Sequence, residues 1–226
     1  MSQSSFGQAA ADSYDDRVKH LAPLRDALQF VTRLALSELP ADAHVLCVGA
    51  GTGAELLDLA EAFPGWRFTA VDPSAFMLRR CQLQAEQTGV GGRCTLHHGT
   101  VSTLGGDTLF DGATSLLVSQ FVVDPAARRQ FFQAIADRLK PRAPLVTADL
   151  AAPAPLDELL KLWKRTGIGA DAPKGPAPGN PPTMGEQVAV LPPADVESLI
   201  TAGGFDAPIR CFQGVLIHGW LARRRG

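Results

Sequence analysis

Three alternating glycines that follow an apolar run constrain this chain more than any other feature. The apolar run covers residues 44–48, and the glycines are Gly49, Gly51 and Gly53. Residues 54–60 then carry leucines and alanines at helical spacing. The stretch therefore predicts a strand, a tight turn and a helix. Glycine lets the backbone of such a turn come close to a ligand at the helix N-terminus, where unpaired N–H groups point outward.

Strands and helices alternate along most of the chain. Strands are predicted at residues 44–49, 66–71, 93–98, 110–119 and 145–150, and helices at 54–62, 74–89, 124–140, 156–165 and 193–202. This alternation implies a mainly parallel sheet covered on both faces by helices. The last two strands, 205–212 and 215–222, lie too close together for a crossover helix, so they form an antiparallel hairpin. The predicted fold is an α/β, doubly wound, Rossmann-like sheet of seven strands.

The 226 residues are predicted to form a single domain with four parts. Residues 1–42 form an N-terminal helical cap, in which Pro23 separates a short helix from a longer one. Residues 43–150 form the core of the domain, and residues 192–226 form the closing helix and hairpin. Residues 151–191 form an insertion over the substrate, because their glycine- and proline-rich stretch is too long for a plain connector.

Composition and charge limit the classes of partner. A net charge of −2 gives no support to bulk nucleic-acid binding. The four cysteines include no CxxC pair, so no metal site or dithiol motif is predicted. The N-terminus has no apolar secretion core and no run is long enough to cross a membrane, so we expect a cytoplasmic protein without a membrane partner. Homodimer formation is left open.

Two classes of cofactor use a glycine turn of this kind, namely dinucleotides and S-adenosylmethionine (SAM). The spacing of Gly49, Gly51 and Ala54 satisfies the loose dinucleotide fingerprint. Asp72 stands where an acid would hold the ribose of either cofactor. Three wider features favour SAM: the helical segment before the first strand, the strict alternation of the glycines, and the closing hairpin in place of another parallel unit.

Four stretches, taken in order, resemble the motifs of the class I SAM-dependent methyltransferases. They are residues 45–53, 68–74, 110–121 and 138–149. Within this superfamily the chain looks closest to small bacterial enzymes loosely similar to the carboxy-SAM synthase group. The resemblance implies SAM as the cofactor, S-adenosylhomocysteine as its product, and in-line methyl transfer to a small-molecule acceptor.

The sequence departs from this family's pattern at two positions. Cys47 stands where the family usually carries an acid beneath the glycine turn. Thr100 stands in the loop after the third strand, which often begins with an acid in the family. The resemblance to the carboxy-SAM synthase group is also incomplete. Carboxy-SAM carries a second carboxylate, which is expected to pair with an arginine, and no arginine lies between Arg165 and Arg210.

The resemblance implies a cofactor site at the carboxyl ends of the first four strands. If the N-terminal cap folds over the cofactor, Tyr14 would cover its methionine part, and Arg17 or Lys19 would meet its carboxylate. The predicted cofactor-binding residues are Tyr14, Gly49, Ala50, Gly51, Gly53, Asp72, Pro73, Met77, Gly99, Thr100, Val101, Ser119 and Gln120. The predicted substrate residues are Phe121, Trp163 and Met184. His20 is the candidate general base if the acceptor must lose a proton.

Two other functions remain open from the sequence alone. An NAD-dependent oxidoreductase would bind NAD(H) and not SAM. A SAM-binding module without catalysis would bind SAM but form no S-adenosylhomocysteine, and the loss of an acid at Cys47 keeps this alternative open.

Overall fold

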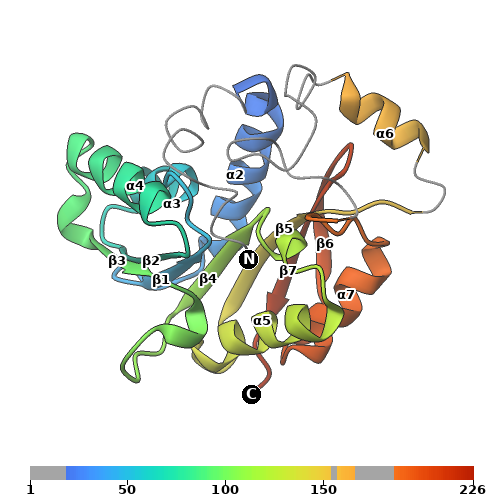
Figure 1. Cartoon of the computed structure of the whole chain (residues 1–226). Helices are drawn as coiled ribbons and strands as arrows, with labels where there is room; N and C mark the ends of the chain where they lie inside the picture. Colours follow the sequence, from blue (N-terminus) through green and yellow to red (C-terminus); the bar gives the residue numbers. More distant parts are fainter. Residues whose placement is uncertain (1–18, 154–156, 166–185) are drawn as a thin grey trace.

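A seven-stranded mixed sheet runs through the middle of the molecule (Figure 1). The computed structural model describes residues 19–153, 157–165 and 186–226. The strands are β1 (His44–Val48), β2 (Arg67–Asp72), β3 (Cys94–His98), β4 (Gly112–Leu116), β5 (Pro144–Leu150), β6 (Ile209–Gly214) and β7 (Ile217–Arg223). Their order across the sheet is β3-β2-β1-β4-β5-β7-β6. The first five are parallel, and β7 is antiparallel to both β5 and β6, which confirms the predicted Rossmann-like fold.

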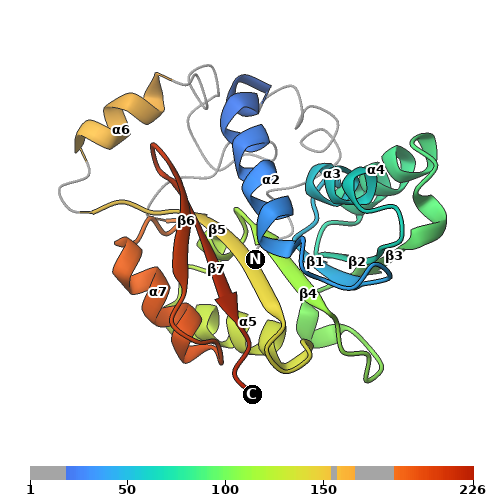
Figure 2. The same ribbon diagram turned by 180° about the vertical axis from the view of Figure 1, so that it is seen from behind.

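Helices cover both faces of the sheet. They are α2 (Ala22–Leu36), α3 (Ala54–Ala62), α4 (Ala75–Gln87), α5 (Pro125–Asp137), α6 (Asp157–Lys164) and α7 (Pro193–Ala202). Both views place α2, α3 and α4 on one face and α5 and α7 on the other (Figures 1 and 2). Strand β5 is buried at every position because it lies inside the sheet with helices on both sides.

The described part of the predicted N-terminal cap is a layer on the sheet. A short 3₁₀ helix, η2 (Lys19–Leu21), leads into α2, and Pro23 lies in the first turn of α2. Proline is accepted there because its missing N–H would have no helical partner, and the change from the short helix to the longer one falls directly before Pro23, at Ala22. Glycines in the hairpin allow close packing: a Cβ at Gly214 would lie 2.7 Å from Leu24 of α2.

Two predicted strands are shorter in the structure. Strand β4 ends at Leu116, because Leu117 takes a left-handed conformation with φ of 60°. The chain then forms a short 3₁₀ helix, η5 (Ser119–Phe121). The first strand of the hairpin begins at Ile209, directly after Pro208, which has no N–H to offer to a sheet.

Helix starts follow the local sequence. Asp124 accepts the Ala127 N–H at the start of α5, and Ser74 accepts the Met77 N–H at the start of α4. Helix α3 is different, since it follows Gly53 and has no side-chain cap. Its first N–H groups are therefore available to a ligand.

Candidate cofactor and acceptor site

The turn after β1 meets the turn after β4 at the point where the strand order reverses. Strands β1 and β4 are neighbours, but the chain continues to α3 on one face and to α5 on the other. A Cβ at Gly49 would lie 2.4 Å from a methyl group of Val118, so only glycine allows the two turns to approach. Ligands of doubly wound folds bind in the crevice at such a switch point.

The three glycines of the turn serve different purposes. All three have positive φ, namely 68° at Gly49, 54° at Gly51 and 92° at Gly53. A Cβ at Gly53 would lie 2.6 Å from the Cys81 sulfur of α4, so this glycine is needed for packing. A Cβ at Gly51 would instead meet only the Gly49 oxygen, at 4.0 Å. Gly51 thus borders open space above the turn, and Ala50 is buried beneath it.

Asp72 ties the end of β2 to this turn. Its Oδ2 accepts the Gly51 N–H at 2.9 Å, and its Oδ1 accepts the Ser74 N–H at 2.8 Å. Burial raises the pKa of this carboxyl group, and the two N–H donors act in the opposite direction. A carboxylate has about four acceptor positions, so Asp72 keeps capacity for ribose hydroxyls. Met77 is buried below, and the Pro73 carbonyl is 3.1 Å from Nε2 of His98.

The loop after β3 offers hydroxyl groups where an acid is common in the family. Thr100 caps the short 3₁₀ helix η4 (Val101–Thr103), and its hydroxyl is 2.8 Å from that of Ser102. The Gly99 N–H donates to the Asp72 carbonyl, which places this loop beside the end of β2. Val101 points into the core, so only its backbone remains for a cofactor contact.

Ser119 and Gln120 direct their side chains into the protein. Both are buried, and their partners come from the end of β5. The Ser119 hydroxyl donates to Asp149 Oδ2 at 2.6 Å, and the Gln120 side-chain oxygen accepts the Leu150 N–H at 2.7 Å. Any contact they make with the cofactor is left to the backbone and to the Gln120 amide nitrogen. Their predicted role as cofactor residues stays a prediction.

The ion pair at the centre of this network was not predicted from the sequence. Arg128 Nη2 lies 3.1 Å from Asp149 Oδ2, and both side chains are fully buried. Arg128 Nε also donates to the Ser119 hydroxyl at 2.8 Å. Burial raises the pKa of Asp149, while Arg128 and the other donors act in the opposite direction. A polar residue at the end of an apolar strand was a usable signal at Asp149, as it was at Asp72.

The predicted substrate residues Phe121 and Trp163 lie in one apolar cluster. It joins α2, the end of β5, α6 and the tip of the hairpin. Its buried members are Leu21, Leu28, Ala148, Leu150, Ala152, Trp163, Val188, Leu216 and Ile217. Phe121 packs against them. Lys19 and the candidate base His20 are exposed directly before Leu21. Tyr14, Arg17 and Met184 fall outside the described residues, so their predicted roles stay predictions.

A glutamate takes up the space beneath the glycine turn. Glu55 of α3 accepts a hydrogen bond from the Thr114 hydroxyl of β4, and burial raises the pKa of Glu55 to about 7. Burial also raises the pKa of the neighbouring Cys47 thiol well above its usual range. An acid is therefore present under the turn, although it comes from the helix and not from β1. Glu55 was not predicted from the sequence as a residue of the site.

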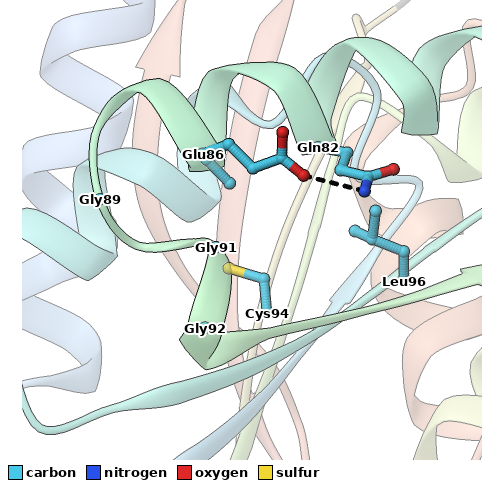
Figure 3. A pocket seen from close by; sticks show the side chains of 8 residues that line it. Gln82, Glu86, Gly89, Gly91, Gly92, Cys94 and Leu96 are labelled. Carbon is cyan, nitrogen blue, oxygen red and sulfur yellow. Dashed lines mark hydrogen bonds between the residues drawn. The ribbon is translucent and has the colours of Figure 1, made fainter.

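A pocket elsewhere in the molecule is separate from this crevice. It lies between the C-terminal half of α4 and β3, at the amino end of the strand. Its lining is Gln82, Ala85, Glu86, Gly89, Gly91, Gly92, Cys94 and Leu96. Figure 3 shows Gln82 and Glu86 turned toward each other, with the amide donating to the carboxylate.

Within the described ranges, no group of side chains is arranged to hold a metal ion, and no helix is long and apolar enough to cross a membrane.

The site and the fold agree with a known family. Residues 45–142 match the family described as "Methyltransferase domain". The matched part of the chain runs from β1 through α5 and carries the glycine turn, Asp72 and the loop after β3. SAM is the cofactor of this family, and the open Gly51 face, the uncapped start of α3 and the Asp72 carboxylate fit it. The predicted recognition, fold, function class and cofactor are confirmed, whereas the finer resemblance to the carboxy-SAM synthase group stays a prediction.

Solved structures share the fold at low sequence identity. A possible exported protein from Bordetella parapertussis is 21% identical, with a TM-score of 0.68, over 90% of this chain and 68% of that one. An N-methyltransferase, NodS from Bradyrhizobium japonicum, solved with S-adenosylhomocysteine, is 17% identical, with a TM-score of 0.60, over 88% of this methyltransferase and 86% of NodS.

An O-methyltransferase family 2 protein from Planctomyces limnophilus, solved with apigenin, is 18% identical, with a TM-score of 0.62, over 86% of this chain and 56% of that one. The methyltransferase described here spans only 54% to 59% of the length of several such structures. No curated protein matches its sequence.

Proposed function

We propose that this methyltransferase transfers the methyl group of SAM to a small, largely apolar acceptor. The observation that carries the proposal is the position of the apolar cluster around Trp163 and Phe121. The cluster includes the end of β5, next to β4, and β4 is followed by the turn that touches Gly49. A cofactor on the glycine turn would therefore face acceptors held by apolar side chains.

The protein's own residues bind and orient the reactants. Gly51 and the first N–H groups of α3 form the open cradle, and Asp72 holds the turn in place. Bound SAM supplies an electrophilic methyl group on its sulfonium, so a short distance and an in-line approach account for most of the catalysis. His20 would accept a proton from an acceptor that loses one, because it is exposed directly before Leu21 of the apolar cluster.

Similar structures support a small-molecule acceptor. The Planctomyces enzyme was solved with apigenin, a planar and mostly apolar molecule. In this chain, the residues of the insertion are rich in alanine, proline and glycine. We infer an acceptor of comparable size, without choosing between oxygen and nitrogen as the methylated atom. We also propose a cytoplasmic location, and we leave homodimer formation open.

Calorimetry and product analysis test the proposal. We expect micromolar binding of SAM and S-adenosylhomocysteine, and no binding of NAD(H). A panel of phenolic, amine and thiol acceptors incubated with SAM should then yield S-adenosylhomocysteine and a product heavier by one methylene unit in mass spectrometry. Binding of NAD(H) without SAM would establish an oxidoreductase. Binding of SAM without product across the panel would favour the non-catalytic module.

A further inference from the structure

Glu55 is the side chain beneath the cofactor turn whose surroundings most need an explanation. It is the second residue of α3, and its side chain is only 9% exposed. Its Oε1 accepts the Thr114 hydroxyl at 2.5 Å, so α3 and β4 meet at this carboxyl group. A carboxyl group buried in this way is expensive to ionise unless another group compensates its charge.

The described surroundings of Glu55 supply no such compensation. The titratable groups that interact with it are the thiols of Cys47 on β1 and Cys81 on α4. Helix α2 packs on α3, but its Arg33 pairs with Asp58 of α3 instead. Only burial and the Thr114 hydrogen bond shift the pKa of Glu55, and no described cation contributes. Within the described residues, an ionised Glu55 would therefore have no cation to compensate its charge.

The cofactor brings a positive charge to the turn that Glu55 underlies. SAM carries a sulfonium, whereas its product S-adenosylhomocysteine has a neutral thioether at the same position. We propose that Glu55 is a positioning residue whose negative charge favours SAM over S-adenosylhomocysteine, in place of the acid that the first strand lacks at Cys47. The proposal rests on SAM being the cofactor of this protein. It gives the site a means to release the product after the methyl group and its charge have left.

A dependence on pH follows from this arrangement. The free protein has Glu55 close to half ionised near pH 7. A cation that binds to the ionised form lowers the pKa of the carboxyl group and releases a proton. If the pKa falls by about one unit, SAM binding tightens about fivefold between pH 6 and pH 8. S-adenosylhomocysteine lacks the charge, so its affinity should stay level over the same range.

Calorimetry with both ligands at pH 6, 7 and 8 tests the proposal. The wild-type protein should show the fivefold change for SAM alone. Glu55→Gln keeps the shape of the side chain and should abolish this change, with a loss of about tenfold in the preference for SAM at pH 8. Glu61→Gln is the matched control, because Glu61 is an exposed acid on the same helix. It should leave both affinities as they are.

A second variant covers the case in which Glu55→Gln does not fold. Thr114→Val removes the donor to Glu55, so the pH at which SAM binding tightens should move upward. Returning an acid to the strand, by adding Cys47→Asp to Glu55→Gln, should restore the preference for SAM.

The proposal is overturned if SAM and S-adenosylhomocysteine follow pH in parallel, or if Glu55→Gln keeps the difference between them. If the wild-type protein binds neither ligand, the proposed function itself fails, which is a separate outcome.

Discussion

The two halves of the site are built in different ways. The cofactor half uses the backbone of one short stretch, the glycine turn after β1, with Asp72 holding it from the end of β2. The proposed acceptor half is assembled from side chains far apart in the sequence, and the buried pair of Arg128 with Asp149 adjoins it at the end of β5. The first half presents the uncapped start of α3 and open space at Gly51. The second half is closed by a buried ion pair and an apolar cluster.

This difference is explained by the kind of molecule that each half has to bind. The cofactor half has to bind one molecule common to a large family, so a backbone cradle that tolerates many neighbouring sequences is sufficient. The acceptor half has to be shaped for one class of molecule, and side chains on separate elements can change independently. The buried pair fixes Ser119 and Gln120, which directly precede Phe121 of the proposed acceptor half. Substitutions in the two halves should therefore have separable effects.

The largest effect is expected at Arg128. Arg128→Met should lower the free energy of unfolding by about 3–5 kcal/mol, because it leaves the Asp149 charge buried without its partner. Chemical denaturation measures the loss. Lys140→Met is the control, since Lys140 is half exposed in its pair with Asp111 and should cost under about 1 kcal/mol. Equal losses in the two variants would mean that burial does not determine how much the Arg128–Asp149 pair contributes to stability.

Glu55→Gln should change stability in the opposite direction at high pH. The pKa of Glu55 is about 7 in the folded protein, against about 4.3 for an unfolded chain. The folded state therefore binds the extra proton, and the stability it contributes is complete below pH 4 and lost as pH rises through 7. Relative to wild type, the variant should gain about 3 kcal/mol between pH 5 and pH 8. Denaturation curves at both pH values measure this gain, and an equal difference at both would contradict it.

Local features were predictable from the sequence, and distant contacts were not. The glycine turn, Asp72 and the order of strands and helices all depend on neighbouring residues, so their patterns are visible in the chain. The end of β4 was misplaced because an apolar run does not reveal the left-handed conformation of Leu117. Phe121 and Trp163 were chosen for their chemistry, and the structure places them in the same cluster.

The polar side chains of the site were harder to assign, because their direction depends on partners elsewhere in the chain. Ser119 and Gln120 were predicted to face the crevice, but Asp149 and Leu150 draw them inward. The roles of Arg128 and Glu55 depend on burial against other elements. No pattern of residue spacing in the sequence predicts that Arg128 and Glu55 are buried. The cofactor half was therefore easier to predict from the sequence than the proposed acceptor half.

Gly51→Ala should separate cofactor binding from packing. The added methyl group enters open space, so backbone strain at the positive φ is its main cost. This strain should lower the stability of Gly51→Ala and of Gly89→Ala equally, by about 1–2 kcal/mol. Gly89 also has positive φ and an open Cβ position, but it lies at the pocket beside α4. Only Gly51→Ala should weaken SAM binding in calorimetry, by about tenfold. Equal SAM affinity in both variants would show that the Gly51 face does not contact the cofactor.

The smallest effect is expected at Phe121, and it tests whether the two halves are independent. Phe121→Leu keeps an apolar side chain and should cost less than about 1.5 kcal/mol of stability. Because Phe121 packs against the cluster proposed to hold the acceptor, KM for the acceptor should rise several-fold while the Kd for SAM stays unchanged. Steady-state kinetics and calorimetry measure the two quantities on the same protein. A parallel loss of SAM affinity would show that the apolar cluster also shapes the cofactor half, and the division between them would then have to be abandoned.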